Sequence, residues 1–228
     1  MTRIWSDFVS LFFPNSCIVC KTPLITGEDF LCLSCLNRLS YTRSEKGTNP
    51  AAKIFAGRPE VKSAHAFLHF KKGNATQKLI FSLKYYNNKR LGFTLGRMAA
   101  LAISRSPEYE LPDVLIPVPL HKTRLKKRGY NQSEWIAKGF NSVINRSIDT
   151  VSLAREKKTN TQTRKNLYER MTGMETSFSL TNPNAFEGKH VLLIDDVITS
   201  GATLNACIEE LRLCSKIEIS VFTLSIAQ

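Results

Sequence analysis

The sequence lacks several features that would assign it to common protein classes. No stretch approaches the roughly eighteen consecutive apolar residues of a membrane span, so no transmembrane helix is predicted. There is no Gly-Lys-Ser or Gly-Lys-Thr phosphate loop and no Gly-x-Gly-x-x-Gly, which excludes two common nucleotide-binding fingerprints. Acidic residues are few, with 19 Asp and Glu against 32 Lys and Arg. The formal charge of +13 favours partners that carry phosphates, such as nucleic acid, nucleotides or an anionic membrane surface.

A recognisable secretory signal is also missing. Apolar residues recur at helical spacing over residues 1–14, but Asp7 interrupts them and no small-residue cleavage site follows. We therefore expect a cytoplasmic protein. The helix predicted there has only Arg3 as a basic anchor. Since membrane-surface helices are usually rich in Lys and Arg, packing against the neighbouring module is favoured over contact with a membrane.

The length and composition are those of one α/β domain with a small appendage. A chain of 228 residues with 43% hydrophobic residues can bury a core of ordinary size. Turn-forming and small residues concentrate between residues 40 and 59, which marks a boundary. The predicted organisation is an N-terminal helix with a cysteine module over residues 1–45, a linker over 46–60 and an α/β domain over 61–228.

Four cysteines form two Cys-x-x-Cys pairs, Cys17 with Cys20 and Cys32 with Cys35. The eleven residues between the pairs let four thiolates meet at one tetrahedral centre, which predicts a structural zinc site in a zinc-ribbon-like module. Iron in a rubredoxin-like site and a redox-active dithiol are the alternatives. Because four protein ligands leave no open position for water, we expect the metal to stabilise a segment too small to bury its own core.

Residues 191–203, with the sequence VLLIDDVITSGAT, predict a buried strand that leads into a glycine turn and a helix. The first four residues are apolar, as in a parallel strand covered on both faces, and Leu204, Ile208 and Leu211 then recur at helical spacing. Gly201 lets the backbone approach a ligand closely, and the free N–H groups at a helix start attract anions. The segment therefore predicts a phosphate site.

Two carboxylates, Asp195 and Asp196, precede this turn. Adjacent negative charges repel an anion, so we expect them to accept hydrogen bonds from ribose hydroxyls and to engage a hard cation such as magnesium. A sugar phosphate with magnesium would supply binding partners to both carboxylates and to the N–H groups of the glycine turn. The simpler alternative is an acidic pair after a buried strand without such a ligand, which other α/β proteins also have. The predicted substrate-binding residues are Asp195, Asp196, Thr199, Ser200, Gly201, Ala202 and Thr203.

A second buried strand, Asp113–Val118, is followed by a strongly basic loop over residues 121–128 and then by an amphipathic helix. Because the carboxyl ends of parallel strands meet at one edge of the sheet, we expect the basic side chains to lie opposite Asp195 and Asp196. They would hold a pyrophosphate or a nucleic-acid backbone, or they form only a solvated charge run. The candidate phosphate contacts in this segment are Arg124, Lys126, Lys127, Arg128 and Gln132.

The rest of the sequence predicts further elements of an α/β sheet. Lys62–Phe70 alternates like a strand, and we expect His65 and His69 on its surface because no carboxylate or nucleophile is near them in sequence. Cys207 and Cys214 lie on the apolar face of the last helix and are predicted core thiols. Further predicted elements are the helices Ala75–Tyr86 and Leu91–Ile103 and a final strand, Ile217–Ile226.

Residues 191–203 resemble the phosphoribosyl pyrophosphate signature of type I phosphoribosyltransferases. With the cysteine pairs and the segments LKYYNNKRLGFTLGRMA and IPVPLHKTRLKKRGYNQSEWIA, they make the chain similar to the ComF (GntX-like) family of competence proteins. The resemblance covers nearly the whole chain. It implies a type I phosphoribosyltransferase-like parallel sheet flanked by helices over residues 61–228. It also implies a role in the uptake of single-stranded DNA during natural transformation of bacteria.

The resemblance further implies roles for individual residues and partners. Asp195 and Asp196 would contact ribose and magnesium, and in an active enzyme they would be the catalytic residues. Residues 199–203 would hold the 5-phosphate. Arg155–Met174 resembles the loop that closes over the substrate, although Gly173 stands where the family pattern has an asparagine. Arg170 fits the family pattern in this loop and would be a further contact of the pyrophosphate or nucleic-acid phosphates. The expected protein partners are a competence helicase and other uptake proteins.

Three functions remain open at this point. The first is a ComF-type DNA-uptake factor that uses its basic loops to engage single-stranded DNA. The second is an active phosphoribosyltransferase in nucleotide salvage or related metabolism. Magnesium and basic residues suffice to stabilise departing pyrophosphate, but no segment of the sequence is recognisable as an acceptor site. The third is a regulator that binds phosphoribosyl pyrophosphate without turnover.

Overall fold

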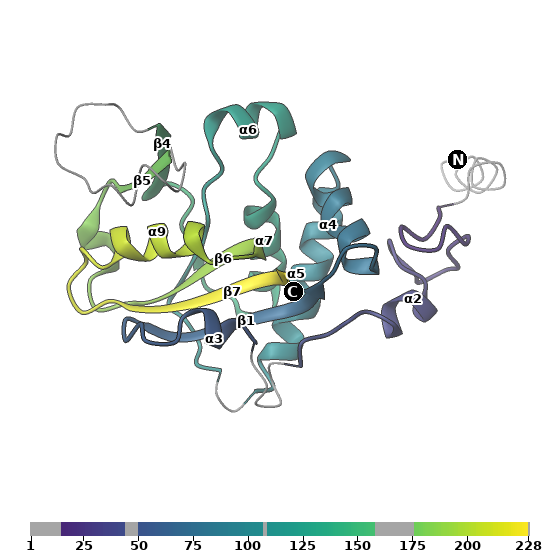
Figure 1. The fold of residues 1–228 in the computed structure, drawn as a ribbon, viewed down its shortest axis with the longest axis horizontal. Helices are drawn as coiled ribbons and strands as arrows, with labels where there is room; N and C mark the ends of the chain where they lie inside the picture. Colours follow the sequence, from purple (N-terminus) through teal and green to yellow (C-terminus); the bar gives the residue numbers. More distant parts are fainter. Residues whose placement is uncertain (1–14, 44–49, 107–108, 158–175, 228) are drawn as a thin grey trace.

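The computed structural model describes residues 15–43, 50–106, 109–157 and 176–227 of the chain (Figure 1). Its centre is a sheet of five strands in which every neighbouring pair is parallel, so the predicted α/β class is confirmed. The strands lie in the order β1 (Val61–Phe70), β7 (Glu218–Ala227), β6 (His190–Ile198), β2 (Val114–Pro117) and β3 (Ser147–Ile148). Outside this sheet lie β4 (Leu153–Lys157), β5 (Thr176–Leu180) and a short 3-10 helix, η2 (Pro183–Phe186).

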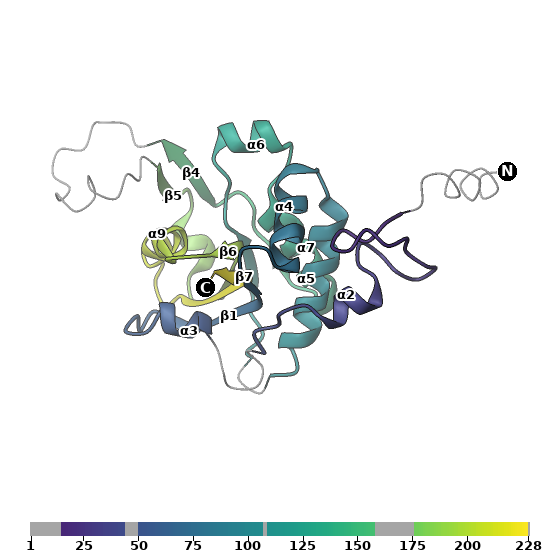
Figure 2. The same ribbon diagram turned by 45° about the vertical axis from the view of Figure 1, so that its right-hand side comes forward.

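Helices cover both faces of the sheet because the strands are apolar on both faces. In β6, Val191 and Leu193 belong to one buried cluster. Leu192 and Ile194, which alternate with them, belong to the other. The first face is covered by α3 (Pro50–Ile54) and α9 (Ala202–Leu211), and the second by α4 (Ala75–Tyr85), α5 (Lys89–Ile103) and α7 (Gln132–Ile144) (Figures 1 and 2).

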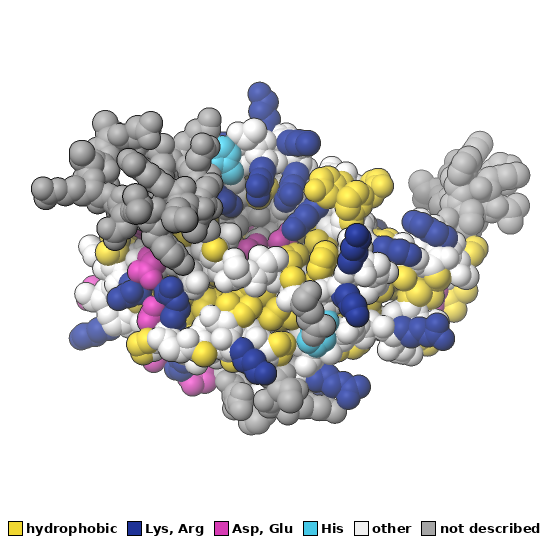
Figure 3. Space-filling model, viewed as in Figure 1, with side chains coloured by type: hydrophobic (Ala, Val, Ile, Leu, Met, Phe, Trp, Pro, Cys, Tyr) yellow, Lys and Arg dark blue, Asp and Glu magenta, His cyan; other side chains and the backbone are white. Residues whose placement is uncertain are grey.

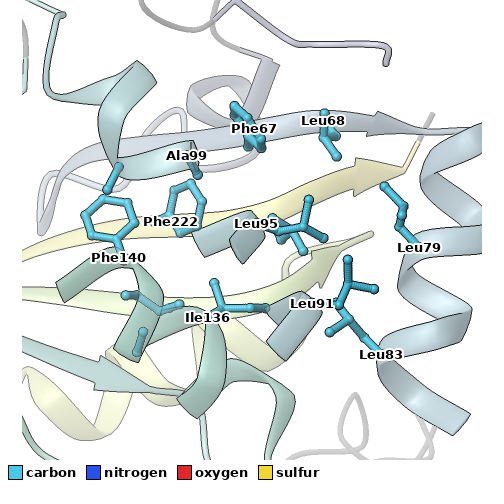
Figure 4. Packing of buried hydrophobic residues seen from close by; sticks show 14 of the residues in the cluster. Phe67, Leu68, Leu79, Leu83, Leu91, Leu95, Ala99, Ile136, Phe140 and Phe222 are labelled. Atoms are coloured by element: carbon cyan, nitrogen blue, oxygen red, sulfur yellow. The ribbon is translucent and has the colours of Figure 1, made fainter. Parts of the chain in front are cut away.

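Two glycines let α5 and α7 approach each other closely. A Cβ at Gly96 would lie 2.1 Å from Ile136 O, and one at Gly139 would lie 1.9 Å from Phe93 O. Any larger residue would therefore push the helices apart. Figure 4 shows the apolar cluster that this approach creates, in which Ile136 of α7 joins Phe222 of β7.

The two helices predicted in the middle of the chain are confirmed as α4 and α5. Asn74 caps α4 by accepting a hydrogen bond from Gln77 N at 3.0 Å, and Asn88 caps α5 by accepting one from Leu91 N at 3.2 Å. The final strand is also confirmed as β7, and it lies inside the sheet between β1 and β6.

The expectation that His65 lies on the strand surface is wrong. His65 is buried, with 3% of its surface exposed, and His69 is half-buried. The reason is that both faces of β1 are covered, with Ala64 and Ala66 in one buried cluster and Phe67, on the same face as His65, in the other. The chain that leaves the cysteine module also pairs with the outer edge of β1. His69 N donates to Ser40 O at 2.7 Å. Thr42 N donates to Phe67 O at 3.1 Å, so this segment extends the sheet past β1.

The basic segment after β2 is a short helix, α6 (Lys122–Arg128), rather than the predicted loop. His121 caps its start, with Nδ1 accepting a hydrogen bond from Thr123 N at 3.2 Å. The helix ends at Gly129, whose φ of 75° is a left-handed conformation that glycine adopts without strain. Cations in the last turn also interact favourably with the helix dipole, which offsets part of their mutual repulsion.

The cysteine module, which contains α2 (Leu33–Asn37), packs against the layer formed by α4 and α5 (Figure 2). Cys17 and Leu39 of the module belong to the same buried cluster as those helices. Lys78 Nζ of α4 donates to Val19 O at 2.8 Å. The module therefore completes its core with residues of the larger domain.

Two further sequence predictions concern the opposite face of the sheet. Cys207 and Cys214 are buried, which confirms them as core thiols. Within the segment predicted as a linker, Pro50–Ile54 forms α3, and Ala51 and Phe55 are buried in the cluster that includes β1. This segment thus contributes to the core of the domain that follows it.

The strands β4 and β5 form an antiparallel pair beside the main sheet. Residues 158–175 between them lie outside the described residues, and they include Arg170 and most of the segment predicted to close over the substrate. The predicted N-terminal helix, residues 1–14, lies outside them as well. No helix in the described part of the chain has the length and apolar character needed to cross a membrane.

Candidate functional site

The predicted acidic pair lies near the end of β6, beside α7 and β7. Asp195 is paired with Thr223 of β7 in the sheet register, and Asp196 is buried, with 8% of its surface exposed. β6 continues to Ile198, and the glycine turn then leads directly into α9, as predicted. Figure 3 shows a hollow in the surface below α6, with acidic side chains on its floor and Lys and Arg side chains at its upper rim.

Asp195 accepts two hydrogen bonds at one carboxylate oxygen. Ser133 Oγ donates to Asp195 Oδ1 at 2.9 Å, and Asp196 N donates to the same atom at 2.8 Å. Burial and then the negative charge of Asp196 raise the pKa of Asp195 to about 7, although the two hydrogen bonds and Lys84 act in the opposite direction. Asp195 is therefore a carboxyl group whose ionisation responds to any additional cation or hydrogen-bond donor.

Asp196 is paired with a lysine that the sequence analysis did not single out. Lys84 Nζ, at the end of α4, lies 3.1 Å from Asp196 Oδ2. Lys84 follows the buried Ile80 by four residues, which places it on the apolar face of α4. A lysine on such a face is the sequence signal for a buried partner, because an unpaired charge there would be strongly unfavourable.

The segment that precedes α7 fixes both Lys84 and Ser133 in position. The buried Tyr130 hydroxyl donates to Leu83 O, and burial raises the pKa of Tyr130 to about 12. Asn131 then caps α7, with Oδ1 accepting a hydrogen bond from Ser133 N at 3.2 Å. These bonds hold the end of α4 and the start of α7 on opposite sides of the acidic pair.

The glycine turn leaves the start of α9 without a side-chain cap. Gly201 has a left-handed φ of 76°, and a Cβ there would lie 2.8 Å from Ile54 Cγ2, so a larger residue is strained as well as crowded. Thr199 and Ser200 are exposed, and the two residues after Gly201 are partly buried. Ala202 N donates to Ser200 Oγ at a long distance, 3.5 Å, so an anion can compete for the N–H groups in the first turn of α9.

The structure separates the predicted basic contacts into two groups. Arg128 Nη1 donates to Gln132 Oε1 at 2.9 Å, next to Ser133. Gln132 is buried, and its Nε2 has no acceptor among the described residues. Lys126 and Lys127 are instead exposed on the last turn of α6, where they form no ion pair with any described carboxylate. Arg128 and Gln132 thus border the acidic pair, while the two lysines face solvent.

Arg155 of β4 adds a cation that the sequence analysis assigned only to the closing loop. Its guanidinium lies over the ring of Phe178, 5.1 Å from the centroid. Burial lowers the pKa of Arg155 most, the charge of Arg124 lowers it further, and Cys207 and Asp195 raise it. Arg155 is therefore within electrostatic range of both α6 and the acidic pair.

The cysteines predicted to bind a metal lie together in the module. Their Sγ atoms are within 4.8 Å of one another, and those of Cys20 and Cys32 are 3.7 Å apart. Four sulfurs about 2.3 Å from one ion in a tetrahedron are separated by about 3.8 Å, so the cluster has the dimensions of a four-thiolate site. The Thr22 hydroxyl lowers the pKa of Cys20 to about 6, while desolvation and the neighbouring thiols raise that of Cys35 to about 12. A bound cation would let all the thiols ionise. The four cysteines are Cys17, Cys20, Cys32 and Cys35.

Comparison with known proteins assigns this geometry to a family. A model of the phosphoribosyl transferase domain matches residues 110–224, half of the chain, including α6, the acidic pair and the glycine turn. The chain belongs to the phosphoribosyl transferase domain family. The cysteine module and α4, which carries Lys84, precede the matched part of this phosphoribosyltransferase domain.

Relatives of known name match a larger part of the chain. Competence protein F of Haemophilus influenzae is 35% identical over 155 residues, which are 64% of this chain and 66% of that protein, just under two thirds. DNA utilization protein YhgH of Escherichia coli K12 is 26% identical over 216 residues, 85% of this chain and 89% of that protein. Among solved structures, glutamine phosphoribosylpyrophosphate amidotransferase of B. subtilis matches with a TM-score of 0.40 and 18% identity, over 62% of this chain and 30% of its own.

We predict that the four cysteines bind a single zinc ion. Elemental analysis of the purified chain should then give stoichiometric zinc, and Cys35→Ser should lose the metal and lower the free energy of unfolding, because metal binding contributes directly to folding. Cys214→Ser, which changes a buried thiol outside the cluster, should keep the zinc. Stoichiometric iron in the wild type, or full zinc retention by Cys35→Ser, would contradict the prediction.

Proposed function

We propose that the site at the end of β6 binds phosphoribosyl pyrophosphate or a related sugar phosphate together with magnesium, in a protein that handles single-stranded DNA. The observation that carries the first part is an acidic pair, Asp195 half-buried and Asp196 buried, beside a helix start that Gly201 does not cap. One lysine faces two carboxylates, and the first turn of α9 has no cap from Gly201 and only a long hydrogen bond, 3.5 Å from Ala202 N to Ser200 Oγ. A phosphorylated pentose with its metal would supply hydroxyls and a cation to the carboxylates, and a phosphate to the start of α9.

Each group has a distinct chemical role in this proposal. The N–H groups and hydroxyls of residues 199–203 hold the 5-phosphate. Asp195 and Asp196 accept hydrogen bonds from the ribose hydroxyls and help to hold magnesium, which neutralises part of the pyrophosphate charge when it is bound. Lys84 pairs with Asp196 before the ligand arrives, and Arg155 attracts the pyrophosphate. Electrostatic preorganisation of this kind requires no protein nucleophile.

Three observations support the DNA-handling part. The chain has a formal charge of +13, which attracts polyanions. The exposed lysines Lys126 and Lys127 are free of described carboxylates, as backbone phosphate contacts need to be. Two relatives are named for competence and DNA utilization. A role in DNA uptake during natural transformation, with a competence helicase and other uptake proteins as partners, is the form of this function that we propose.

A second candidate function is catalysis of phosphoribosyl transfer, and the family match favours it. The bond between the sugar carbon and pyrophosphate would break, the acceptor would form the new bond, and Asp195 and Asp196 would be the catalytic residues. Release of pyrophosphate in a screen of acceptors distinguishes the two functions. Pyrophosphate release that disappears in Asp196→Asn favours the enzyme. Absence of pyrophosphate release with every acceptor favours a ligand-binding role.

We expect phosphoribosyl pyrophosphate to bind the wild type only when magnesium is present. Asp196→Asn should weaken binding by about tenfold or more, because it removes a carboxylate that would help to hold magnesium and accept hydrogen bonds from the ribose hydroxyls. Equilibrium dialysis with radiolabelled ligand measures the affinity. Asp29→Asn, which changes an exposed carboxylate in the cysteine module, is the matched control and should bind normally. Equal affinities of Asp196→Asn and Asp29→Asn would exclude the acidic pair as the ligand site.

We also expect Lys126→Gln and Lys127→Gln to weaken binding of single-stranded DNA and to reduce its salt dependence. The slope of log affinity against log salt concentration should fall by about 0.7 for each lysine that contacts a phosphate. Lys53→Gln removes an exposed cation from α3, far from α6 (Figure 1), and should leave the slope unchanged. A slope in the α6 variants that equals that of Lys53→Gln would show that these lysines do not contact DNA.

A further inference from the structure

Three aromatic side chains at the end of α4 are exposed close to the acidic pair. Phe81, Tyr85 and Tyr86 have 50%, 58% and 71% of their surfaces exposed. The ring centroid of Phe81 lies 4.5 Å from that of Tyr85 and 5.9 Å from that of Tyr86, so the three rings form one surface. We call this group the aromatic platform. Figure 3 shows an apolar patch at the end of α4, beside the cations of α6.

The fold does not account for the exposure of this platform. α4 packs on the sheet through its other face, with Leu79, Ile80 and Leu83 buried. Every large aromatic residue that is exposed in the described part of the chain belongs to the platform. Exposed apolar residues scattered singly are common, whereas a cluster of rings on one helix indicates a binding surface.

The surroundings of the platform are cationic. The Arg128 guanidinium lies 5.8 Å from the ring centroid of Tyr85. Lys89 Nζ, at the start of α5, lies 5.8 Å from the ring centroids of both Tyr130 and Trp135. Lys126 and Lys127 extend this positive edge along α6. A ligand that fits here therefore has flat apolar faces and negative charge in the same molecule.

We propose that the aromatic platform stacks the bases of single-stranded nucleic acid whose phosphates lie along α6. This inference rests on the proposed DNA-handling function and adds the place where the bases bind. Bases stack on exposed aromatic rings regardless of sequence, and cations beside the rings hold the backbone. A duplex hides its base faces in its own stack, so the platform selects single strands. A partner protein with an apolar surface fits the rings but not their cationic surroundings.

The platform borders the sugar-phosphate site. Arg128 contacts Tyr85 on one side and Gln132 Oε1, at 2.9 Å, on the other. Ser133, next in the chain, donates to Asp195. On α4 itself, Lys84 pairs with Asp196 while its neighbour Tyr85 is exposed. A strand on the platform thus lies beside the groups that would bind phosphoribosyl pyrophosphate.

The test compares two strands of equal length and charge, oligothymidine and an abasic oligonucleotide, by fluorescence anisotropy with the full chain. The wild type should bind oligothymidine more tightly than the abasic strand. Tyr85→Ala combined with Tyr86→Ala should weaken binding of oligothymidine by about fivefold or more and leave binding of the abasic strand nearly unchanged. Tyr85→Phe combined with Tyr86→Phe keeps the rings and should bind as the wild type does.

Exposed apolar residues elsewhere supply the matched control. Val151→Ala and Leu213→Ala change residues that are 76% and 67% exposed, and they should retain the preference for oligothymidine. If the wild type binds both strands equally and the alanine variant does not differ from it, the platform proposal is overturned while the DNA-handling function stands. If the wild type binds neither strand, the DNA-handling function itself fails. Unchanged DNA binding with altered self-association in sedimentation would identify a protein interface and overturn the proposal.

Discussion

Two adjacent carboxylates held at the buried end of a parallel strand are the constraint on which the rest of the site depends. The charges of Asp195 and Asp196 oppose each other where little water screens them, so the surrounding elements must supply compensating groups. Ser133 of α7 donates to Asp195, and Lys84 of α4 pairs with Asp196. Ser225 of β7 donates to Asp196 O at 3.2 Å. The close packing of α5 on α7, which two glycines permit, keeps these elements in register.

The helix α4 contacts or carries three features of the chain: the cysteine module, the aromatic platform and the lysine that reaches the acidic pair. Near its start, Lys78 bonds to the cysteine module, so this module also supports the helix. Its outer face carries the aromatic platform, and Lys84 at its end reaches the acidic pair. The phosphoribosyl transferase domain match begins after α4, at residue 110. The cysteine module, the aromatic platform and the lysine that pairs with Asp196 therefore meet on a helix outside that match.

Local patterns in the sequence predict the strand, turn and helix of residues 191–203 and the cysteine cluster, because each is encoded by contiguous residues or fixed spacing. Contacts between distant segments are not encoded in this way. The pairing of Lys84 with Asp196 and the bond from Ser133 to Asp195 join residues far apart in sequence. His65 is buried because both faces of β1 are covered by other elements, which the alternation of its own strand does not indicate. The charges of the basic segment 121–128 predict a loop, but Lys122–Arg128 forms a helix that His121 caps at its start and Gly129 ends.

The ionisation of Asp195 gives the most direct test of the acidic pair as the site of the sugar phosphate and its metal. Its pKa of about 7 lies above the ordinary value near 4, so the protonated form contributes stability that is lost as the pH rises through 7. A bound cation and ribose hydroxyls favour the ionised form, and binding must therefore release the proton. Calorimetric titration of phosphoribosyl pyrophosphate with magnesium, in two buffers of different ionisation enthalpy near pH 7, counts the protons released. The wild type should release about half a proton more than Asp195→Asn, and this difference should vanish at higher pH. Equal proton release by the two proteins near pH 7 would contradict ligand binding at the acidic pair.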